Sequence, residues 1–381
     1  MAKSSEIART TIDQKVVMRL WGMSAGRCEL CNKLLYIDSS FGDSANFAEN
    51  AHIHAVGTTG PRHKDEMERS EINQIDNLML LCAEHHHLID TKPENYPGDY
   101  LVRKKKEHEA RIRSLTEIRE DASCKMVTYF SNIDDTTVFS ADDMLRRAVV
   151  HEKLYPKQDV PISLNEGSLT KYVPSKIMIE HQAIALANQV RLNFRGLMRE
   201  ESIAVFALAP QPLLIKLGTL ICDQLNVHIF QCHREGEKWT WPEDSSSVDF
   251  LFQKTKESDG SILAFVIDLS AQIVDDRITS VLGDNCTIYH LTIESPNRLF
   301  VKNVAIQETF VQSFRMAMET LKNDNPGCRA IHVFPAMPQS LAICAGMDYM
   351  PKADLPMIIY EQVSPDIGFI ETLVIGGTTD V

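Results

Sequence analysis

A group of potential metal ligands near the N-terminus most constrains what this chain can fold into. From Cys82 to Asp90 the sequence reads Cys-Ala-Glu-His-His-His-Leu-Ile-Asp, and much earlier Cys28 and Cys31 form a Cys-x2-Cys pair. A Cys-x2-Cys pair followed at a distance by Cys-x2-His has the spacing of a closed tetrahedral zinc site. We therefore predict a small zinc-stabilised unit in which Cys28, Cys31, Cys82 and His85 supply the four ligands.

Further histidines in this region are not needed as zinc ligands, so they could take part in catalysis or lie on the protein surface. His52 and His54 alternate along a predicted strand, so they should share one of its faces. His86 and Asp90 lie one turn apart on a predicted helix that begins near residue 83, and His87 is next to them. The alternative is a purely structural zinc knuckle whose surplus histidines lie on the surface.

The whole chain has the composition of an ordinary globular protein. Its 381 residues allow two or three domains, and it is 44% hydrophobic and 24% charged. No apolar run approaches the roughly 20 residues needed to span a bilayer. The N-terminus lacks the apolar segment of a secretion signal, which predicts a cytoplasmic protein. Nine cysteines, an odd number, fit a reducing compartment in which thiols are core residues or metal ligands.

Charge is distributed unevenly along the chain. The formal net charge of −13 would by itself argue against nucleic acid as a partner. Residues 1–120 carry 17 Lys and Arg against 19 Asp and Glu, or −2, whereas residues 121–381 carry 22 against 33, or −11. A basic run at residues 103–106 lies on a predicted helix of the first part. This run is consistent with a basic face that contacts phosphates, and equally with an ordinary solvated helix surface.

The chain divides into three predicted parts. Residues 1–120 form the metal-containing domain, the polar and Pro-containing residues 121–165 form a linker region with one helix, and residues 166–381 form a second domain. In that domain short apolar strands alternate with helices, a pattern typical of parallel α/β sheets. The runs 200–295 and 300–375 predict two similar α/β lobes, although no sequence repeat between them is apparent.

The motifs around the metal ligands extend beyond the cysteines. Ala51-His52-Ile53 is followed, eight residues after the histidine, by Gly-Pro-Arg, and Asp76-Asn77-Leu78 precedes the Cys-x2-His-His-x3-Asp segment. Over roughly residues 20–95 this pattern resembles the zinc-containing HNH nucleases with a ββα-metal fold. The resemblance implies an α+β domain with a structural zinc ion on the four ligands named above.

The same resemblance implies roles for individual residues. His52 matches the general base that takes a proton from the attacking water, a task that suits an imidazole because its pKa lies near neutrality. Asn77 matches the residue that holds the loop and orients His52. His86 matches a ligand of the catalytic Mg²⁺ or Mn²⁺ ion, which would stabilise the pentacoordinate phosphate and the leaving oxygen. Because His85, His86 and His87 are adjacent, their assignment to these roles stays open.

One position departs from the pattern of the family. Many HNH nucleases place an acidic or histidine metal ligand directly before the general base, and this chain has Ala51 there. A second ligand to the catalytic ion must then come from Glu49, His54 or Asp90, or from water, which Mg²⁺ retains readily.

A second, more diffuse set of motifs lies near the C-terminus. It comprises the stretch from Ile331 to Ala342, Met350-Pro351-Lys352 and Ile359-Tyr360-Glu361. Over about residues 160–380 the chain resembles a SAVED domain, which implies two fused Rossmann-like lobes similar to CARF domains. An HNH domain followed by SAVED is similar to the effector endonucleases of CBASS antiphage systems. In that family a cyclic oligonucleotide made by a partner synthase switches on DNA degradation.

The resemblance also implies the partners of this protein. They are double-stranded DNA as substrate and a cyclic di- or trinucleotide as activator. Because one HNH unit with one catalytic metal centre nicks a single strand, we expect a homo-oligomer on activation.

The nucleotide pocket is predicted from the fold class alone. Parallel α/β sheets bind ligands beyond the carboxyl ends of their strands, where helix N-termini favour phosphate. Two tryptophans in a predicted loop could stack on a base, a contact worth roughly 1–3 kcal/mol, or could instead pack between the lobes. The resulting candidates are Gln211, Trp239, Trp241, Ser270, Gln339 and Ser340.

Three functions fit these observations. The first is a ligand-gated, metal-dependent DNA endonuclease. The second is a site-specific HNH restriction nuclease whose C-terminal part reads DNA, although the charge of −11 over residues 121–381 argues against DNA recognition there. The third is a non-enzymatic, zinc-stabilised nucleic-acid-binding regulator, which needs no catalytic metal.

Overall fold

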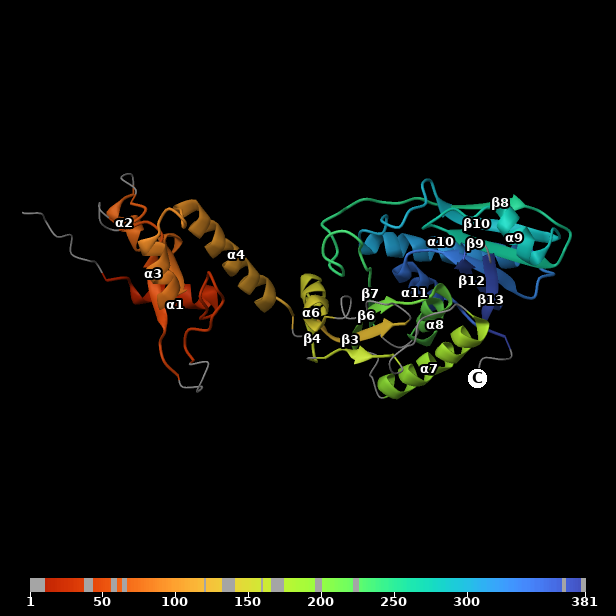
Figure 1. Ribbon diagram of the computed structural model, residues 1–381, viewed down its shortest axis with the longest axis horizontal. Helices are drawn as coiled ribbons and strands as arrows, with labels where there is room; N and C mark the ends of the chain where they lie inside the picture. The colour runs from red at the N-terminus through yellow and green to blue at the C-terminus, as the bar shows by residue number, and fades with distance from the viewer. Residues whose placement is uncertain are drawn as a thin grey trace, which may run out of the picture. The chain divides into compact units, whose positions relative to one another are not determined.

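The computed structural model describes most of the chain, in two compact units. The units are Met1–Ile118 and Arg119–Val381. The described residues are 11–37, 44–55, 60–63, 67–119, 121–131, 141–158, 160–165, 175–195, 201–221, 226–364 and 368–377. Figure 1 shows their helices and strands. No helix among these residues is long and apolar enough to cross a membrane.

The first unit is built on an antiparallel hairpin followed directly by a helix. Strand β1 (Ala48–His52) pairs with β2 (Leu78–Cys82), and α3 (Ala83–Thr91) begins where β2 ends. All residues of β2 are buried, so this strand forms the centre of the small core. The helices α1 (Gln14–Ser24), α2 (Arg69–Ile72) and α4 (Gly98–Thr116) and the short 3-10 helix η1 (Ile75–Asn77) complete the unit. Strand, strand and helix therefore form one ββα arrangement, as the sequence predicts.

The second unit begins with a parallel sheet in the strand order β4-β3-β6-β7, with β5 also paired to β3. This is the first lobe. Its elements, in chain order, are β3 (Ser123–Phe130), α6 (Asp142–His151), β4 (Tyr155–Pro156), β5 (Ile162–Ser163), α7 (Lys176–Phe194), β6 (Ser202–Leu208), α8 (Gln211–Ile221) and β7 (Asn226–Phe230). The linker predicted over residues 121–165 is therefore wrong for its described part. Those residues supply β3, a central and largely buried strand, to the sheet.

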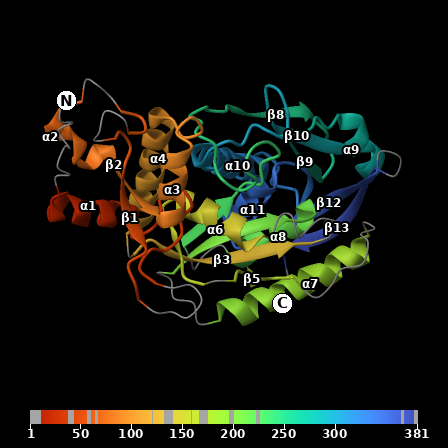
Figure 2. The ribbon, with the colours of Figure 1, turned by 60° about the vertical axis from the view of Figure 1, so that its left-hand side comes forward.

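A second sheet has the order β13-β12-β11-β9-β10-β8, and it forms the second lobe (Figure 2). Its four inner strands are parallel, and β8 and β13 are antiparallel edge strands. The elements are β8 (Phe250–Lys256), β9 (Ile262–Asp268), α9 (Asp275–Leu282), β10 (Cys286–Ile293), α10 (Val304–Asp324), β11 (Ile331–Ala336), α11 (Gln339–Asp348), β12 (Met357–Ser364) and β13 (Gly368–Ile375). The prediction of parallel α/β sheets is confirmed.

The two lobes share one topology. In the first lobe the order β4-β3-β6-β7 matches β10-β9-β11-β12 in the second, and the connecting helices α6, α7 and α8 match α9, α10 and α11. The predicted lobe boundaries, 200–295 and 300–375, are wrong because each of those runs contains only part of a lobe. The matching strands and helices also carry a repeat, Ile-x-Val-Phe-x3-Pro-Gln-x-Leu-x-Ile-x2-Gly, at residues 203–218 and again at 331–346.

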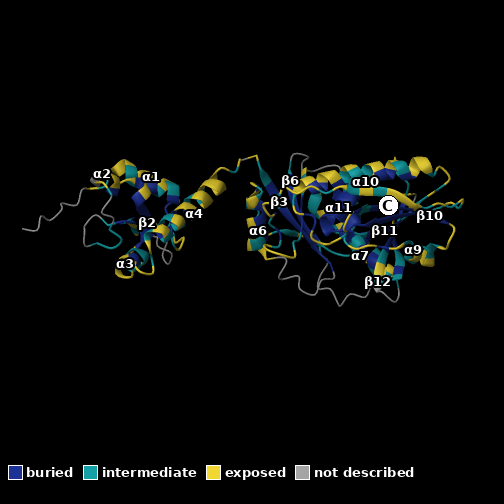
Figure 3. Ribbon diagram, turned by 90° about the horizontal axis from the view of Figure 1, so that it is seen from above, coloured by how far each residue is buried: buried dark blue, intermediate teal, exposed yellow. Residues whose placement is uncertain are grey.

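The repeated glycines allow the lobes to pack closely. Helices α8 and α11 pack against each other, and each contacts the last strands of the opposite lobe. A Cβ atom on Gly218 would lie 2.2 Å from the Ile343 carbonyl oxygen, and one on Gly346 would lie 2.0 Å from that of Ile215. Only glycine permits this close contact between helix backbones. Figure 3 shows buried strands inside the unit and exposed residues along the outer face of α10.

Candidate functional site

The first candidate site is a cluster of three cysteines and one histidine. The ligand atoms of Cys28, Cys31, Cys82 and His85 all lie within 4.8 Å of one another. The Cys82 Sγ atom is 3.2 Å from His85 Nδ1 and 4.0 Å from Cys31 Sγ. The Cys3His cluster predicted from the spacing is confirmed, and three sulfur donors with one imidazole nitrogen are a donor set that suits structural zinc.

Local backbone geometry positions these four side chains. A tight turn follows Cys28: the Asn32 N–H donates to the Cys28 carbonyl at 2.8 Å, and Asn32 adopts a positive φ of 64°. Cys82 is the N-cap residue of α3, which places His85 in the first helical turn. Burial raises the pKa of the Cys31 thiol to about 11 and also raises the pKa of Cys82. A bound divalent cation offsets this cost because it deprotonates a coordinating thiol.

The basic helix α4 contacts the segment that carries Cys28. Lys105 is buried in α4, with its Nζ atom 3.9 Å from the buried carboxylate of Glu29 and bonded to Glu109. Arg103 and Lys104 pair with Glu107 on the surface of the same helix. Lys105 therefore stabilises the fold, and Arg103 and Lys104 are paired within the helix. These contacts favour a structural role for Arg103, Lys104 and Lys105 over a basic face that binds phosphates.

The predicted general base lies at the end of β1. His52 Nε2 is 2.9 Å from Asn73 Oδ1, a partner that the sequence motifs do not indicate. Asn77 is buried and bonds three backbone groups: its Oδ1 accepts from the His54 N–H, and its Nδ2 donates to the His54 and Ile72 carbonyls. Asn77 therefore holds the chain directly after His52, whereas the residue bonded to the His52 ring is Asn73.

His86 lies between two carboxylates. Its Nδ1 is 3.8 Å from Glu49 Oε2, and its Nε2 is 3.5 Å from Asp90 Oδ2. Glu49 and Ala51 share one face of β1, since side chains two residues apart in a strand point the same way. Glu49 thus reaches His86 from the face on which many HNH nucleases carry the ligand that is missing at Ala51.

The third candidate ligand, His54, is engaged elsewhere. It is buried, and its Nδ1 lies 2.8 Å from the Arg62 carbonyl. Arg62 belongs to the Gly-Pro-Arg motif, and its guanidinium donates to the carbonyls of Ile53 and Ile89 and contacts Asp90. Arg62 therefore ties the end of β1 to α3. Among the three candidates, Glu49 and Asp90 lie beside His86 and His54 does not.

Two family models match the chain, one on each unit. Residues 28–92 match the HNH endonuclease family. Residues 186–375 match SAVED, described as "SMODS-associated and fused to various effectors sensor domain". The chain joins an HNH domain to a SAVED domain. No curated protein sequence matches it.

Solved structures of the Cap4 SAVED/CARF-domain containing receptor show a limited similarity to this HNH–SAVED chain. The Acinetobacter baumannii receptor with 2′3′3′-cAAA gives a TM-score of 0.44 at 12% identity, over 81% of this chain and 65% of that one. The same receptor with 3′3′3′-cAAA gives 0.43 at 12% identity, with the same coverage. The Moraxella osloensis receptor gives 0.37 at 11% identity, over 77% of this chain and 60% of that one. The HNH–SAVED chain thus spans less than two thirds of the receptor chain in each of these three structures.

Three of the predicted pocket residues in the SAVED domain meet where α8 and α11 begin. Gln211 Nε2 donates to the Met337 carbonyl at 2.8 Å, and Ser340 Oγ donates to Gln231 Oε1 at 2.6 Å. Gln339 Nε2 lies 3.4 Å from the Phe230 carbonyl. The repeat explains this arrangement, because Gln211 and Gln339 occupy the same repeat position.

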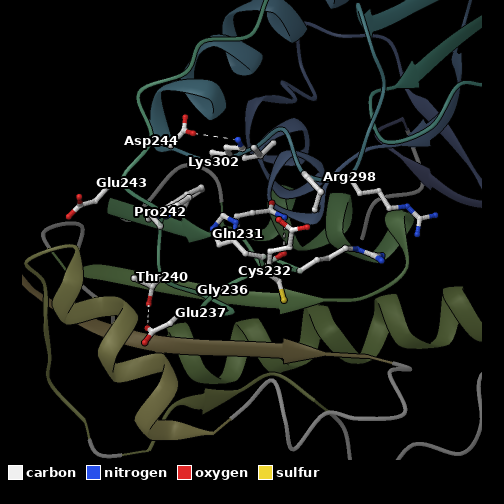
Figure 4. Close-up of a pocket in the computed structure, with 16 residues that line it drawn as sticks. Gln231, Cys232, Gly236, Glu237, Thr240, Pro242, Glu243, Asp244, Arg298 and Lys302 are labelled. Carbon is white, nitrogen blue, oxygen red and sulfur yellow. Dashed lines mark hydrogen bonds and ion pairs between the residues drawn. The ribbon is translucent and has the colours of Figure 1, made fainter.

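The remaining predicted pocket residues have different surroundings. Ser270 lies just beyond the carboxyl end of β9, and its N–H donates to the Ala336 carbonyl at the end of β11. Trp239 is fully buried and packs edge-on against Phe206 at 5.3 Å, which favours the packing alternative over stacking on a base. Trp241 is largely buried and lines a cavity of about 510 Å³ in this unit (Figure 4). Trp239 thus anchors the polar segment around it to the hydrophobic core of the first lobe.

One acidic residue near α8 belongs to the Ile359-Tyr360-Glu361 motif but is not among the predicted pocket residues. Glu361 on β12 accepts a hydrogen bond from the Gln211 N–H, and burial raises the pKa of its carboxyl to about 7. Among the described residues, neither Glu361 Oε2 nor Gln211 Oε1 has a hydrogen-bond partner. In the strand alignment Glu361 takes the place that Gln231 takes in the first lobe, so the two junctions between the lobes differ chemically.

Proposed function

We propose that this protein is a metal-dependent DNA endonuclease that a cyclic oligonucleotide switches on. One observation carries the proposal. A single chain joins an HNH domain, in which His86 lies between two carboxylates, to a domain of a family described as a sensor fused to effectors. An effector that degrades double-stranded DNA when a messenger nucleotide appears suits antiphage defence.

The donors around His86 fit a divalent cation. An imidazole flanked by the carboxylates of Glu49 and Asp90 offers nitrogen and oxygen ligands, and Mg²⁺ or Mn²⁺ commonly takes its remaining ligands from water. When bound, such an ion stabilises the charge that develops on a phosphodiester and on its leaving oxygen. His86 is therefore proposed as a metal ligand, with Glu49 or Asp90 as the second.

His52 is proposed as the general base, and Asn73 as the residue that orients it. If the His52 Nε2–H donates to Asn73 Oδ1, then Nδ1 carries a free lone pair and can accept a proton from water. Asn77 holds the backbone beyond His52 through its three buried hydrogen bonds. These contacts restrict the ring to one orientation.

A plasmid-cleavage assay tests the proposal. Full-length protein is incubated with supercoiled plasmid and Mg²⁺, with and without each member of a panel of cyclic di- and trinucleotides. We expect degradation only with Mg²⁺ and a matching nucleotide, and none with the His52→Ala variant. Discrete fragments without any nucleotide would instead indicate a site-specific restriction nuclease. Plasmid that is bound but stays intact under every condition would indicate a non-enzymatic regulator.

A further inference from the structure

Two arginines of the HNH domain converge on the turn that follows Cys28. Arg27 lies directly before this turn, and its Nη1 donates to the Asn32 carbonyl at 3.1 Å. Arg111 lies on α4, and its Nη2 donates to the Asn32 side-chain Oδ1 at 2.7 Å. Asn32 itself is exposed. One surface residue therefore holds two guanidinium groups that come from distant parts of the sequence.

The Arg111 guanidinium is fixed by a second neutral acceptor. Its Nη2 lies 3.0 Å from Nδ1 of His108, which is buried three residues earlier on α4. His108 Nε2 lies 3.1 Å from the Ser24 carbonyl, so Nε2 carries the proton and Nδ1 accepts from Arg111. Burial lowers the pKa of His108, and the charges of Arg111 and Arg27 lower it further, against the opposing effects of the Ser24 bond and of Glu109. The ring is therefore neutral near pH 7. Because these contacts already order the side chain, little entropy is lost when it binds an anion.

Neither arginine has a carboxylate partner in the part of the chain that the structure describes. The two acidic residues that precede Arg111 on α4, Glu107 and Glu109, are paired with basic residues of the same helix. Lys33, which follows Asn32, is exposed and adds a further positive charge at the turn. Both guanidinium groups thus bond to neutral acceptors, and each keeps N–H donors that an anion can accept.

The Cys3His cluster connects this turn to the proposed catalytic centre. Cys31 directly precedes Asn32, and its Sγ lies within 4.8 Å of the ligand atom of His85. His86 follows His85 in α3 and lies beside Glu49 and Asp90. The arginine pair and the proposed metal ligand therefore belong to segments that one cluster joins. A duplex that presents one phosphate to His86 offers further phosphates on either side of it, because every nucleotide carries one.

We propose that Arg27 and Arg111 form a phosphate clamp, which binds the DNA backbone away from the bond that is cleaved. A guanidinium group matches the geometry of phosphate because it can donate two parallel N–H···O hydrogen bonds. Contacts to phosphate carry no sequence information, so such a clamp suits the degradation of DNA of any sequence. This inference rests on the proposed function, in which the substrate is double-stranded DNA.

DNA binding by the full-length protein tests the clamp without measuring cleavage. The parent protein carries His52→Ala so that the DNA stays intact. A short fluorescein-labelled duplex is titrated with it at several salt concentrations in Mg²⁺, with and without the cyclic nucleotides of the cleavage assay. Arg27→Gln and Arg111→Gln should each weaken binding about 10-fold, because hydrogen bonds to a charged group are lost. The slope of log K against log salt concentration should become shallower by about 0.9 for each phosphate contact removed.

The matched control is Arg113→Gln, which removes the same charge from the same helix. Arg113 is exposed and lies about 200° around the helix axis from Arg111, because each residue advances by about 100°. The control variant should bind the duplex like the parent protein, with the same salt slope. All three variants should keep the thermal unfolding midpoint and the zinc content of the parent.

The outcomes separate the clamp from the proposed function. Unchanged affinity and an unchanged salt slope in both clamp variants would overturn the clamp and leave the proposed function standing. An equal loss of affinity in the control would show a general effect of charge and would also overturn it. Loss of zinc from a clamp variant would show that the arginines instead offset the negative charge of the thiolates in the Cys3His cluster. Failure of the parent protein to bind the duplex under any of these conditions would contradict DNA cleavage itself, and the clamp with it.

Discussion

At the scale of single residues, three adjacent histidines have three different environments. His85 belongs to the Cys3His cluster, His86 lies between two carboxylates, and the His87 side chain is exposed. Successive residues of a helix point about 100° apart because a turn contains about 3.6 residues, so neighbours face different surroundings. Sequence spacing indicates how many ligands are present, and the start of α3 at Ala83 decides which histidine faces which site.

The first prediction concerns the nuclease histidines. His52→Ala should lower the DNA cleavage rate by ~10²–10⁴, because that is the usual contribution of a general base. His86→Ala should be similarly inactive because it loses a ligand of the catalytic ion, and its binding of Mn²⁺ should weaken, whereas the His52 variant should still bind Mn²⁺. His87→Ala is the matched control and should cleave normally. Normal cleavage by the His52 variant would remove that residue from the mechanism.

The second prediction concerns a buried histidine in the second lobe. His290 Nε2 is 2.9 Å from Asp275 Oδ1, and its Nδ1 is 3.3 Å from Asp268 Oδ1. Burial alone would lower the pKa of His290, but the two carboxylates outweigh burial and raise it. A pKa raised in the folded state stabilises the fold at pH values below the unfolded pKa of about 6.5. That stabilisation is lost as the pH rises through the folded pKa.

Urea unfolding followed by tryptophan fluorescence checks this prediction. The free energy of unfolding of the second unit should exceed that of the His290→Gln variant most at low pH, and the difference should shrink as the pH rises above about 6.5. Comparing the two proteins is necessary because the pKa of Glu361 is raised to about 7 and that carboxyl titrates in the same interval. A difference that does not change with pH would contradict a charged His290.

At the scale of elements, the Cys3His cluster joins the turn after Cys28 to the junction of β2 and α3. The third prediction is that Cys82→Ser unfolds the first unit rather than only lowering activity. Structural zinc contributes about 10–16 kcal/mol of apparent folding free energy in small finger peptides, and this core is small. Calorimetry combined with metal analysis checks this. A well-folded, zinc-free variant would contradict a structural zinc site.

The fourth prediction concerns the contact between α8 and α11. Gly218→Ala and Gly346→Ala should each destabilise the second unit by about 1–3 kcal/mol or more, because the new Cβ atom would overlap a backbone carbonyl of the other helix. Gly327→Ala is the control, since a Cβ atom there would meet nothing within 4 Å. Equal unfolding midpoints for all three variants would show that the helices move apart without cost.

The sequence predicts the local features of this fold better than the long-range ones. The ligand spacing, the ββα order and the parallel sheets follow from short motifs and periodicity. Strand β3 is missed because polar residues flank it, although Met126 and Val127 are buried in a central strand. The repeat in the lobes is missed because its identical residues are separated by variable ones along a strand and a helix. Only the alignment of the two lobes by strand order shows that Gly218 and Gly346 occupy the same position. The contacts of Asn73 with His52 and of Glu361 with Gln211 come from long-range pairings that no local pattern encodes.

At the scale of the whole molecule, the net negative charge of the second part of the chain is consistent with activity that is controlled by association of protomers. Residues 121–381 carry a net charge of −11, from 22 basic and 33 acidic residues, so free protomers should repel one another through these parts. A ligand shifts such an equilibrium only by its differential affinity for the assembled form, and a near-complete switch requires a ratio of about 10⁴. The fifth prediction is that light scattering detects a larger species only with the matching cyclic nucleotide. An unchanged mass with full activity would locate the control within one protomer or a preformed assembly.

The most direct test of the account is the rate of plasmid cleavage as a function of cyclic-nucleotide concentration, at fixed protein and Mg²⁺. If the SAVED domain controls the HNH domain, the rate should start near zero and rise with the occupancy measured by calorimetry. Linear DNA should then accumulate. A rate that is already maximal without nucleotide, or that stays at zero while nucleotide saturates the protein, would contradict the central claim.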